Sequence, residues 1–173
     1  MQVFGFDTES KPTFKVGEKS TGPHLIQLSS LENAYLFQVN PEILAFLKPI
    51  LENEQQLKVG FGLKNDASGF RRKGIHPNGL IDLAKCFSNF GYNTQVGVQT
   101  AIALLFQRYF PKSKKISTSN WSTKALSQQQ INYAAADAYA ARIIFEYLYQ
   151  HQSFTSPLQQ QIERILTGSQ SKT

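Results

Sequence analysis

The segment Ser127–Tyr149 constrains the fold more than any other part of the chain, because it predicts a long helix that packs closely on a sheet. It contains the run Asn-Tyr-Ala-Ala-Ala-Asp-Ala-Tyr at positions 132–139. Alanine is the best helix former, and a face of small side chains lets a helix approach a sheet closely. Asp137 lies among these alanines, and an acid buried on an apolar helix needs a partner. We therefore expect Asp137 to contact other polar groups.

Short β-rich segments and helical patterns alternate along the rest of the chain. The predicted strands are residues 2–6, 24–28, 34–39 and 57–61, and residues 80–87 hold a short strand or the start of a helix. The predicted helices are residues 41–51, 63–72, 98–110, 127–149 and 157–166, with loops at 11–23 and 112–122. The second and third strands are predicted to form a hairpin. This order predicts an α/β domain with a partly antiparallel sheet.

Length and composition exclude several classes of protein. The chain of 173 residues suits a single domain, predicted over residues 1–167, with residues 168–173 as a flexible tail. A hydrophobic fraction of 41% excludes disorder, and the single Cys86 excludes an internal disulfide and a cysteine-based zinc site. No apolar run reaches the ~20 residues of a membrane helix, and no signal-peptide pattern is seen. We expect a soluble, cytoplasmic protein with no membrane partner and with protein partners that the sequence leaves unknown.

Positive charge is concentrated in the middle of the chain. Residues 55–145 contain twelve Lys and Arg but only three Asp, whereas the whole chain has a net charge of +6. A basic surface of this strength favours polyanions such as nucleic acids, because binding releases counterions. The alternative is a generic basic surface that keeps the protein soluble.

Acidic side chains occur in three places where the predicted elements bring them to defined positions. Asp7 and Glu9 follow the first strand and share one of its faces, since side chains alternate with a period of two. Two such carboxylates repel each other unless a cation or a proton intervenes. Asp66 follows a Gly-Phe-Gly turn at a helix start, where the macrodipole favours an acid. Tyr133 and Asp137 are four residues apart and share a helix face. The alternative for each acid is a purely structural role.

Together these segments resemble the three motifs of the DEDDy 3′-5′ exonucleases. The motifs are Asp-Thr-Glu at 7–9, Gly-Phe-Gly-Leu-Lys-Asn-Asp at 60–66, and Tyr133 followed by Asp137. Asn-Trp-Ser at 120–122 adds a similarity to the exonuclease domain of the Werner syndrome helicase, and the chain is also similar to ribonuclease D. The resemblance implies a ribonuclease-H-like fold with a five-stranded sheet in the order 3-2-1-4-5, flanked by helices.

The same resemblance implies a metal-dependent enzyme that removes nucleoside 5′-monophosphates from the 3′ end of DNA or RNA, with a slight preference for DNA. Two Mg²⁺ or Mn²⁺ ions suit an all-oxygen ligand set. Asp7 is expected to bridge both ions, Glu9 and Asp137 to complete the first site, and Asp66 to hold the second. Tyr133 is expected to orient the attacking water. The alternative is a non-catalytic nucleic-acid-binding module on the same fold, which predicts the loss of at least one acid.

The expected substrate is a single-stranded or 3′-recessed nucleic acid, held through its phosphates. Residues predicted to contact it are Lys64, Arg71, Arg72, Lys112, Lys114, Lys115 and Trp121. The lysines at 112–115 could equally be a solvated loop. Trp121 could stack on a base or lie in the core, and the core is favoured because a lone Trp usually packs there.

Overall fold

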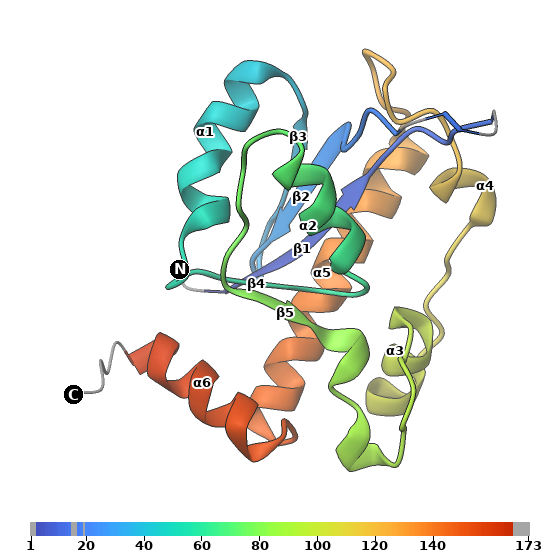
Figure 1. Cartoon of the computed structure of the whole chain (residues 1–173). Helices are drawn as coiled ribbons and strands as arrows, with labels where there is room; N and C mark the ends of the chain where they lie inside the picture. Colours follow the sequence, from blue (N-terminus) through green and yellow to red (C-terminus); the bar gives the residue numbers. More distant parts are fainter. Residues whose placement is uncertain (1–2, 15–16, 19, 168–173) are drawn as a thin grey trace.

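The computed structural model describes residues 3–14, 17–18 and 20–167 (Figure 1), so the predicted tail 168–173 lies outside the described residues. The strands are β1 (Val3–Glu9), β2 (Leu25–Ser29), β3 (Ala34–Gln38), β4 (Leu57–Gly60) and β5 (Leu80–Asp82). The α-helices are α1 (Pro41–Glu52), α2 (Lys64–Arg71), α3 (Val98–Phe106), α4 (Lys114–Ser117), α5 (Gln128–Gln150) and α6 (Ser156–Thr167). Two 3₁₀ turns, Leu83–Lys85 and Ser88–Phe90, follow β5.

The strands form one mixed sheet in the order β3-β2-β1-β4-β5, which confirms the predicted order. β1 lies at the centre, antiparallel to β2 and parallel to β4. β2 and β3 form the predicted hairpin, and β4 and β5 are parallel. The start of β1 is paired with β4, and its second half, from Gly5 to Glu9, is paired with β2, which fixes the faces to which its side chains point.

Helices cover both faces of the sheet (Figure 1). On one face, α1 and α2 pack on a core that includes Phe6, Leu47 and Phe70. On the other face, α5 crosses the sheet with α3 and α6 beside it, and its core includes Val59 and Ile144. Phe6 faces the α1 side. Because the strand alternates, the neighbouring odd-numbered residues of β1 face α5.

β1 and α5 approach each other closely at Gly5. A Cβ atom at this glycine would collide with the backbone oxygen of Ala138 and would lie 2.9 Å from the Cβ of Arg142. Ala138 is completely buried. The small residues of α5 therefore serve the close packing that the sequence predicts.

The start of α5 also matches the sequence prediction. Ser127 caps the helix, and a reciprocal capping box joins it to Gln130. This arrangement satisfies backbone groups that would otherwise be unpaired at the helix start. No helix in the part of the chain that the structure describes is long and apolar enough to cross a membrane.

The segment between α3 and α5 differs from the prediction. The predicted helix 98–110 ends at Phe106, because Gln107 adopts a left-handed conformation with φ of 53°. Residues 107–113, here called the strap, turn back along α3, where the Gln99 side chain donates to the Phe110 carbonyl at 3.1 Å. The predicted loop 112–122 contains the short helix α4, capped by Ser113.

Two of the bases counted in the basic segment do not contribute to an exposed surface. Lys58 is fully buried on β4, and its ammonium donates to the carbonyls of Ile50 and Asn53 at the end of α1. This burial lowers the pKa of Lys58 to about 8. Arg142 is 9% exposed and pairs with Glu146 at 2.7 Å. The basic surface is therefore smaller than the sequence count indicates.

The contact at Gly5 gives a prediction about stability. We expect Gly5→Ala to lower the free energy of unfolding by about 3 kcal/mol or more, because the new methyl group collides with the backbone of α5. Gly97→Ala is the control, since a Cβ atom there meets nothing within 4 Å; its effect should stay within about 1 kcal/mol. Urea unfolding of both variants measures this. Equal effects would show that β1 and α5 are not packed as described.

Candidate active site

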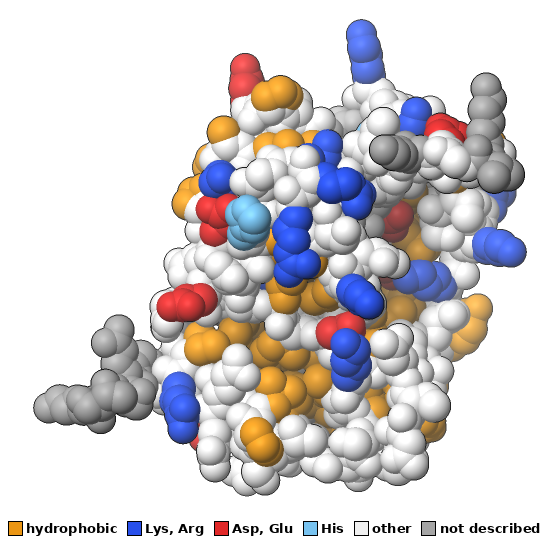
Figure 2. All heavy atoms as spheres, in the orientation of Figure 1, with side chains coloured by type: hydrophobic (Ala, Val, Ile, Leu, Met, Phe, Trp, Pro, Cys, Tyr) orange, Lys and Arg blue, Asp and Glu red, His pale blue; other side chains and the backbone are white. Residues whose placement is uncertain are grey.

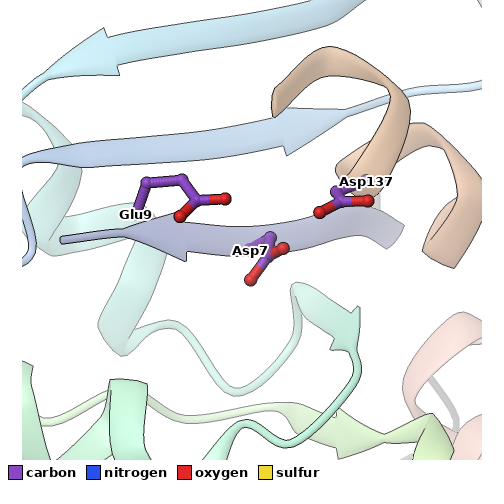
Figure 3. Close-up of side chains that lie close together, drawn as sticks. All are labelled: Asp7, Glu9 and Asp137. Atoms are coloured by element: carbon purple, nitrogen blue, oxygen red, sulfur yellow. The ribbon is translucent and has the colours of Figure 1, made fainter. Parts of the chain in front are cut away.

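Three carboxylates from β1 and α5 come together at the end of β1 (Figure 3). Asp7 and Glu9 project from β1, and Asp137 projects from α5. One ligand oxygen from each residue lies within 4.8 Å of the others. We call these three residues the acid cluster. Strand alternation puts Asp7 and Glu9 on the same face of β1, and the close packing of α5 on that face adds Asp137.

The surroundings of the acid cluster disfavour its charged form. Burial, together with the charges of Asp137 and Asp66, raises the pKa of Asp7 to about 8. Burial and repulsion from Asp7 and Asp137 together raise the pKa of Glu9 to about 9. The pKa of Asp137 is raised by burial too, although Lys112 and Tyr133 oppose the shift. Without a cation, the cluster therefore holds protons at neutral pH.

Asp66 lies in the first turn of α2, outside the acid cluster. Its carboxylate accepts a hydrogen bond from the Thr8 hydroxyl. Together with Ser10 and Arg72 these residues line a polar cavity of about 170 Å³. Burial raises the pKa of Asp66. The charge of Asp66 also contributes to the raised pKa of Asp7.

The turn that leads from β4 to Asp66 is held by Asp82. The Gly62 N–H donates to the Asp82 carboxylate at 2.8 Å, and Asp82 also caps the 3₁₀ turn after β5. Gly62 has a φ of 72°, which only glycine adopts readily. Gly62 therefore allows the turn between β4 and α2 that places Asp66 at the start of the helix.

Tyr133 lies one helical turn before Asp137 and is 9% exposed. Its ring packs on Trp121, with the ring centroids 6.1 Å apart. Trp121 is only 1% exposed, and its indole N–H donates to the Ser117 carbonyl at 3.1 Å. Trp121 therefore lies in the core, the position that the sequence analysis favours for it, and supports Tyr133 there; its contact with a base stays a prediction.

The predicted basic residues differ in how close they lie to the acid cluster. Lys112, on the strap, pairs with Asp137, its Nζ atom 3.0 Å from Oδ2. Lys64, Arg71 and Arg72 are exposed on or beside α2, and Lys114 and Lys115 are exposed on α4. Figure 2 shows Lys and Arg side chains gathered around a hollow in which acidic side chains are visible. Only Lys112 among the predicted residues reaches the described acids through an ion pair.

Gln27 is a residue near the site that sequence reasoning missed. It pairs with Asp7 across β1 and β2, so both side chains lie on the α5 face of the sheet. It is completely buried, and among the described residues its amide oxygen and nitrogen have no hydrogen-bond partner. A buried amide without hydrogen bonds is unfavourable and rare in proteins. Its presence beside Asp7 therefore indicates a functional site. The signal lies in the strand register, which the sequence does not show.

The acid cluster fits a divalent cation. Hard cations prefer oxygen ligands, and three carboxylates supply them. The carboxylates are held close by a rigid sheet and helix although their charges repel, which a bound cation would relieve. A cavity of about 100 Å³ adjoins Asp7 and Asp137, with Phe61, Val98 and Ala141 among its lining residues. These features leave room for small polar species beside the carboxylates.

The raised pKa of Asp7 predicts how pH affects the metal-free protein. An Asp with a pKa near 3.8 when unfolded and about 8 when folded binds more protons in the folded state. Stability must therefore fall as pH rises between those values. We expect Asp7→Asn to reduce this fall, so that the variant gains relative to the wild type from pH 5 to pH 8. Urea unfolding in EDTA measures it, with Glu54→Gln as a distant control. A constant difference between Asp7→Asn and wild type would contradict the prediction.

A 3′-5′ exonuclease family model matches residues 1–151, which is most of the chain. The chain is 32% identical to the bifunctional 3′-5′ exonuclease/ATP-dependent helicase WRN of Mus musculus over 157 residues. That match covers 84% of this chain and 11% of the relative. It is also 33% identical to ribonuclease D of Granulibacter bethesdensis over 110 residues, covering 62% of this chain and 27% of the relative.

Among solved structures, ribonuclease D of Trypanosoma brucei in complex with RNA U12 superposes with a TM-score of 0.76 at 18% identity. The match covers 99% of this chain and 66% of that one. This similarity shows the ribonuclease-H-like fold that the sequence motifs imply. The chain spans between about a tenth and about half of the length of the first curated relatives it matches.

Proposed function

Because the chain belongs to the 3′-5′ exonuclease family, we propose that it hydrolyses phosphodiester bonds of DNA or RNA from the 3′ end and releases nucleoside 5′-monophosphates. The observation that carries this proposal is the acid cluster, whose three carboxylates face one point. A non-catalytic module on the same fold would have lost at least one acid, whereas Asp7, Glu9, Asp66 and Asp137 are all present.

The family's use of divalent metal ions gives the acid cluster its role. We propose two Mg²⁺ or Mn²⁺ ions, with Asp7 as the shared ligand. Glu9 and Asp137 would hold one ion, and Asp66 the other. When bound, such ions supply positive charge for the phosphodiester and a nucleophilic water at neutral pH. The protein's contribution is to hold these carboxylates on a sheet and a helix that do not rearrange.

Tyr133 would orient the attacking water through its hydroxyl. Burial raises the pKa of Tyr133 above its usual value, so the hydroxyl keeps its proton at neutral pH. A neutral phenol can donate a hydrogen bond and accept one, but it is a poor base. Its ring is fixed by the contact with Trp121 and by its place one turn before Asp137. Tyr133 is therefore suited to positioning rather than to proton abstraction.

The exposed cations of α2 and α4 would bind the strand that leads into the site. Arg71 and Arg72 lie at the end of α2, and Lys114 and Lys115 lie on α4. Contacts to phosphates position a strand without reading its bases. We therefore propose that the chain acts on single-stranded or 3′-recessed ends with little sequence preference. The four side chains would contribute through long-range attraction that salt weakens.

A digestion of 5′-labelled single strands tests the proposed function. With Mn²⁺, the wild type should shorten DNA or RNA stepwise from the 3′ end, giving a ladder and free nucleoside 5′-monophosphates. Asp7→Asn should reduce the rate by at least about 100-fold, on the scale seen when one electrostatic group is removed from an active site. Mn²⁺ should raise the melting temperature of the wild type but barely that of the variant.

Glu54→Gln provides the control for this experiment, because it removes one carboxyl from an exposed turn. It should keep the wild-type rate and the wild-type response to Mn²⁺. Wild-type protein that binds Mn²⁺ but leaves every labelled strand intact would refute exonuclease activity. Equal activity of Asp7→Asn and wild type would refute the assignment of the acid cluster.

The role of Tyr133 is tested by Tyr133→Phe, which keeps the ring and removes the hydroxyl. We expect kcat to fall by about 10- to 1000-fold, the range of a positioning or proton-transfer contact, while KM changes little. Initial rates over a range of strand concentrations, up to saturation, measure kcat and KM. An unchanged kcat would show that Tyr133 only packs against Trp121.

A further inference from the structure

Lys112 occupies an unusual position for a substrate-binding lysine, because its ammonium already lies among the carboxylates. Its Nζ atom is 3.0 Å from Asp137 Oδ2 and 5.6 Å from the centre of the Tyr133 ring. The Asp137 side chain is only 5% exposed, whereas the Lys112 side chain is 35% exposed. The pair therefore joins a buried anion to a cation that retains access to solvent.

The charge of Lys112 acts on the whole acid cluster. Its positive charge lowers the pKa of Asp7, Glu9 and Asp137, opposing the effects of burial and repulsion. Burial alone would lower the pKa of Lys112 itself, but Asp137 and its neighbours raise it, so the ammonium stays charged. Among the described residues, no other cation forms an ion pair with a member of the cluster.

A divalent ion and the Lys112 ammonium would compete for the Asp137 carboxylate. Asp137 Oδ2 faces Lys112, and the Asp137 carboxylate is also one of the three that converge on the candidate metal site. Two cations placed a few ångströms apart repel each other strongly where solvent screening is weak. Lysine is suited to leaving, because its charge sits at the end of four flexible methylenes. Its exposed side gives it a path away from Asp137.

We propose that Lys112 is a displaceable counter-ion: it neutralises Asp137 in the metal-free protein, yields Asp137 to the incoming divalent ion, and then binds a phosphate of the substrate strand. This inference rests on the proposed function, because it takes the acid cluster as the metal site. After displacement the ammonium remains tethered by the strap beside the cluster. The nearest new anion offered to it there is the phosphate backbone of a bound strand.

Lys115 provides a control that distinguishes the proposed role of Lys112 from a general effect of positive charge. It belongs to the same basic segment, but it is exposed on α4 and forms no ion pair with the acids that the structure describes. A purely structural role for Lys112, tying the strap to α5, makes a different prediction. Its removal would then destabilise the protein without changing how tightly the cluster binds metal.

Calorimetric titration of the substrate-free protein with Mn²⁺ tests the proposal. We expect Lys112→Met to bind Mn²⁺ at least about 10-fold more tightly than the wild type, because the competing charge is gone. Lys112→Arg should bind Mn²⁺ with close to the wild-type affinity. Lys115→Met should match the wild type in Mn²⁺ affinity, which is the only property for which it serves as the control. At saturating Mn²⁺, Lys112→Met should raise KM for a labelled strand, since the phosphate contact is lost.

The outcomes distinguish this inference from the proposed function. Unchanged or weaker Mn²⁺ binding by Lys112→Met would overturn displacement while leaving the metal site and the exonuclease proposal intact. An unchanged KM at saturating Mn²⁺ would overturn the phosphate contact. Wild-type protein that binds no Mn²⁺ would refute the proposed metal site and the inference with it. Circular dichroism of Lys112→Met confirms that the comparison is made between folded proteins.

Discussion

The close approach of β1 and α5 at Gly5 is the contact on which the rest of the site depends. Gly5 touches the helix beside Ala138, and Asp7 lies two residues further along the same face of the strand. Asp137 directly precedes Ala138. A larger residue at position 5 would push the helix away and carry Asp137 with it. The alanines of α5 and the glycine of β1 thus set the spacing between carboxylates that come from distant parts of the chain.

That spacing forces negative charge together in a partly buried place, which is unfavourable for folding. The raised pKa values of Asp7 and Glu9 express this cost, since binding a proton removes one of the repelling charges. Sites of function often reduce stability in this way, because the groups are arranged for a ligand rather than for the empty protein. The buried Gln27, whose amide has no partner among the described residues, lies beside Asp7 and adds a second unfavourable polar group to the same region.

Local periodicity made much of the site predictable from the sequence. Strand alternation places Asp7 and Glu9 on one face, and helical spacing places Tyr133 above Asp137. What periodicity could not show were contacts between distant segments. The ion pair of Lys112 joins residues twenty-five positions apart in the sequence, and the position of Gln27 opposite Asp7 depends on the strand register. Burial of a basic side chain is equally invisible to a count of charges.

The end of α3 shows how one backbone conformation controls the site's electrostatics. A helix that continued through residue 110, as its apolar pattern predicts, would carry the following lysines away along its axis. Instead Gln107 turns left-handed, and the strap runs back until the Phe110 carbonyl meets the Gln99 side chain near the start of α3. A positive φ is uncommon for a residue other than glycine, so the tertiary packing must favour it. This reversal brings Lys112 to Asp137 and leaves Lys114 and Lys115 outside. The chain thereby separates one short-range cation, which acts on the carboxylates, from cations that act on a strand at longer range.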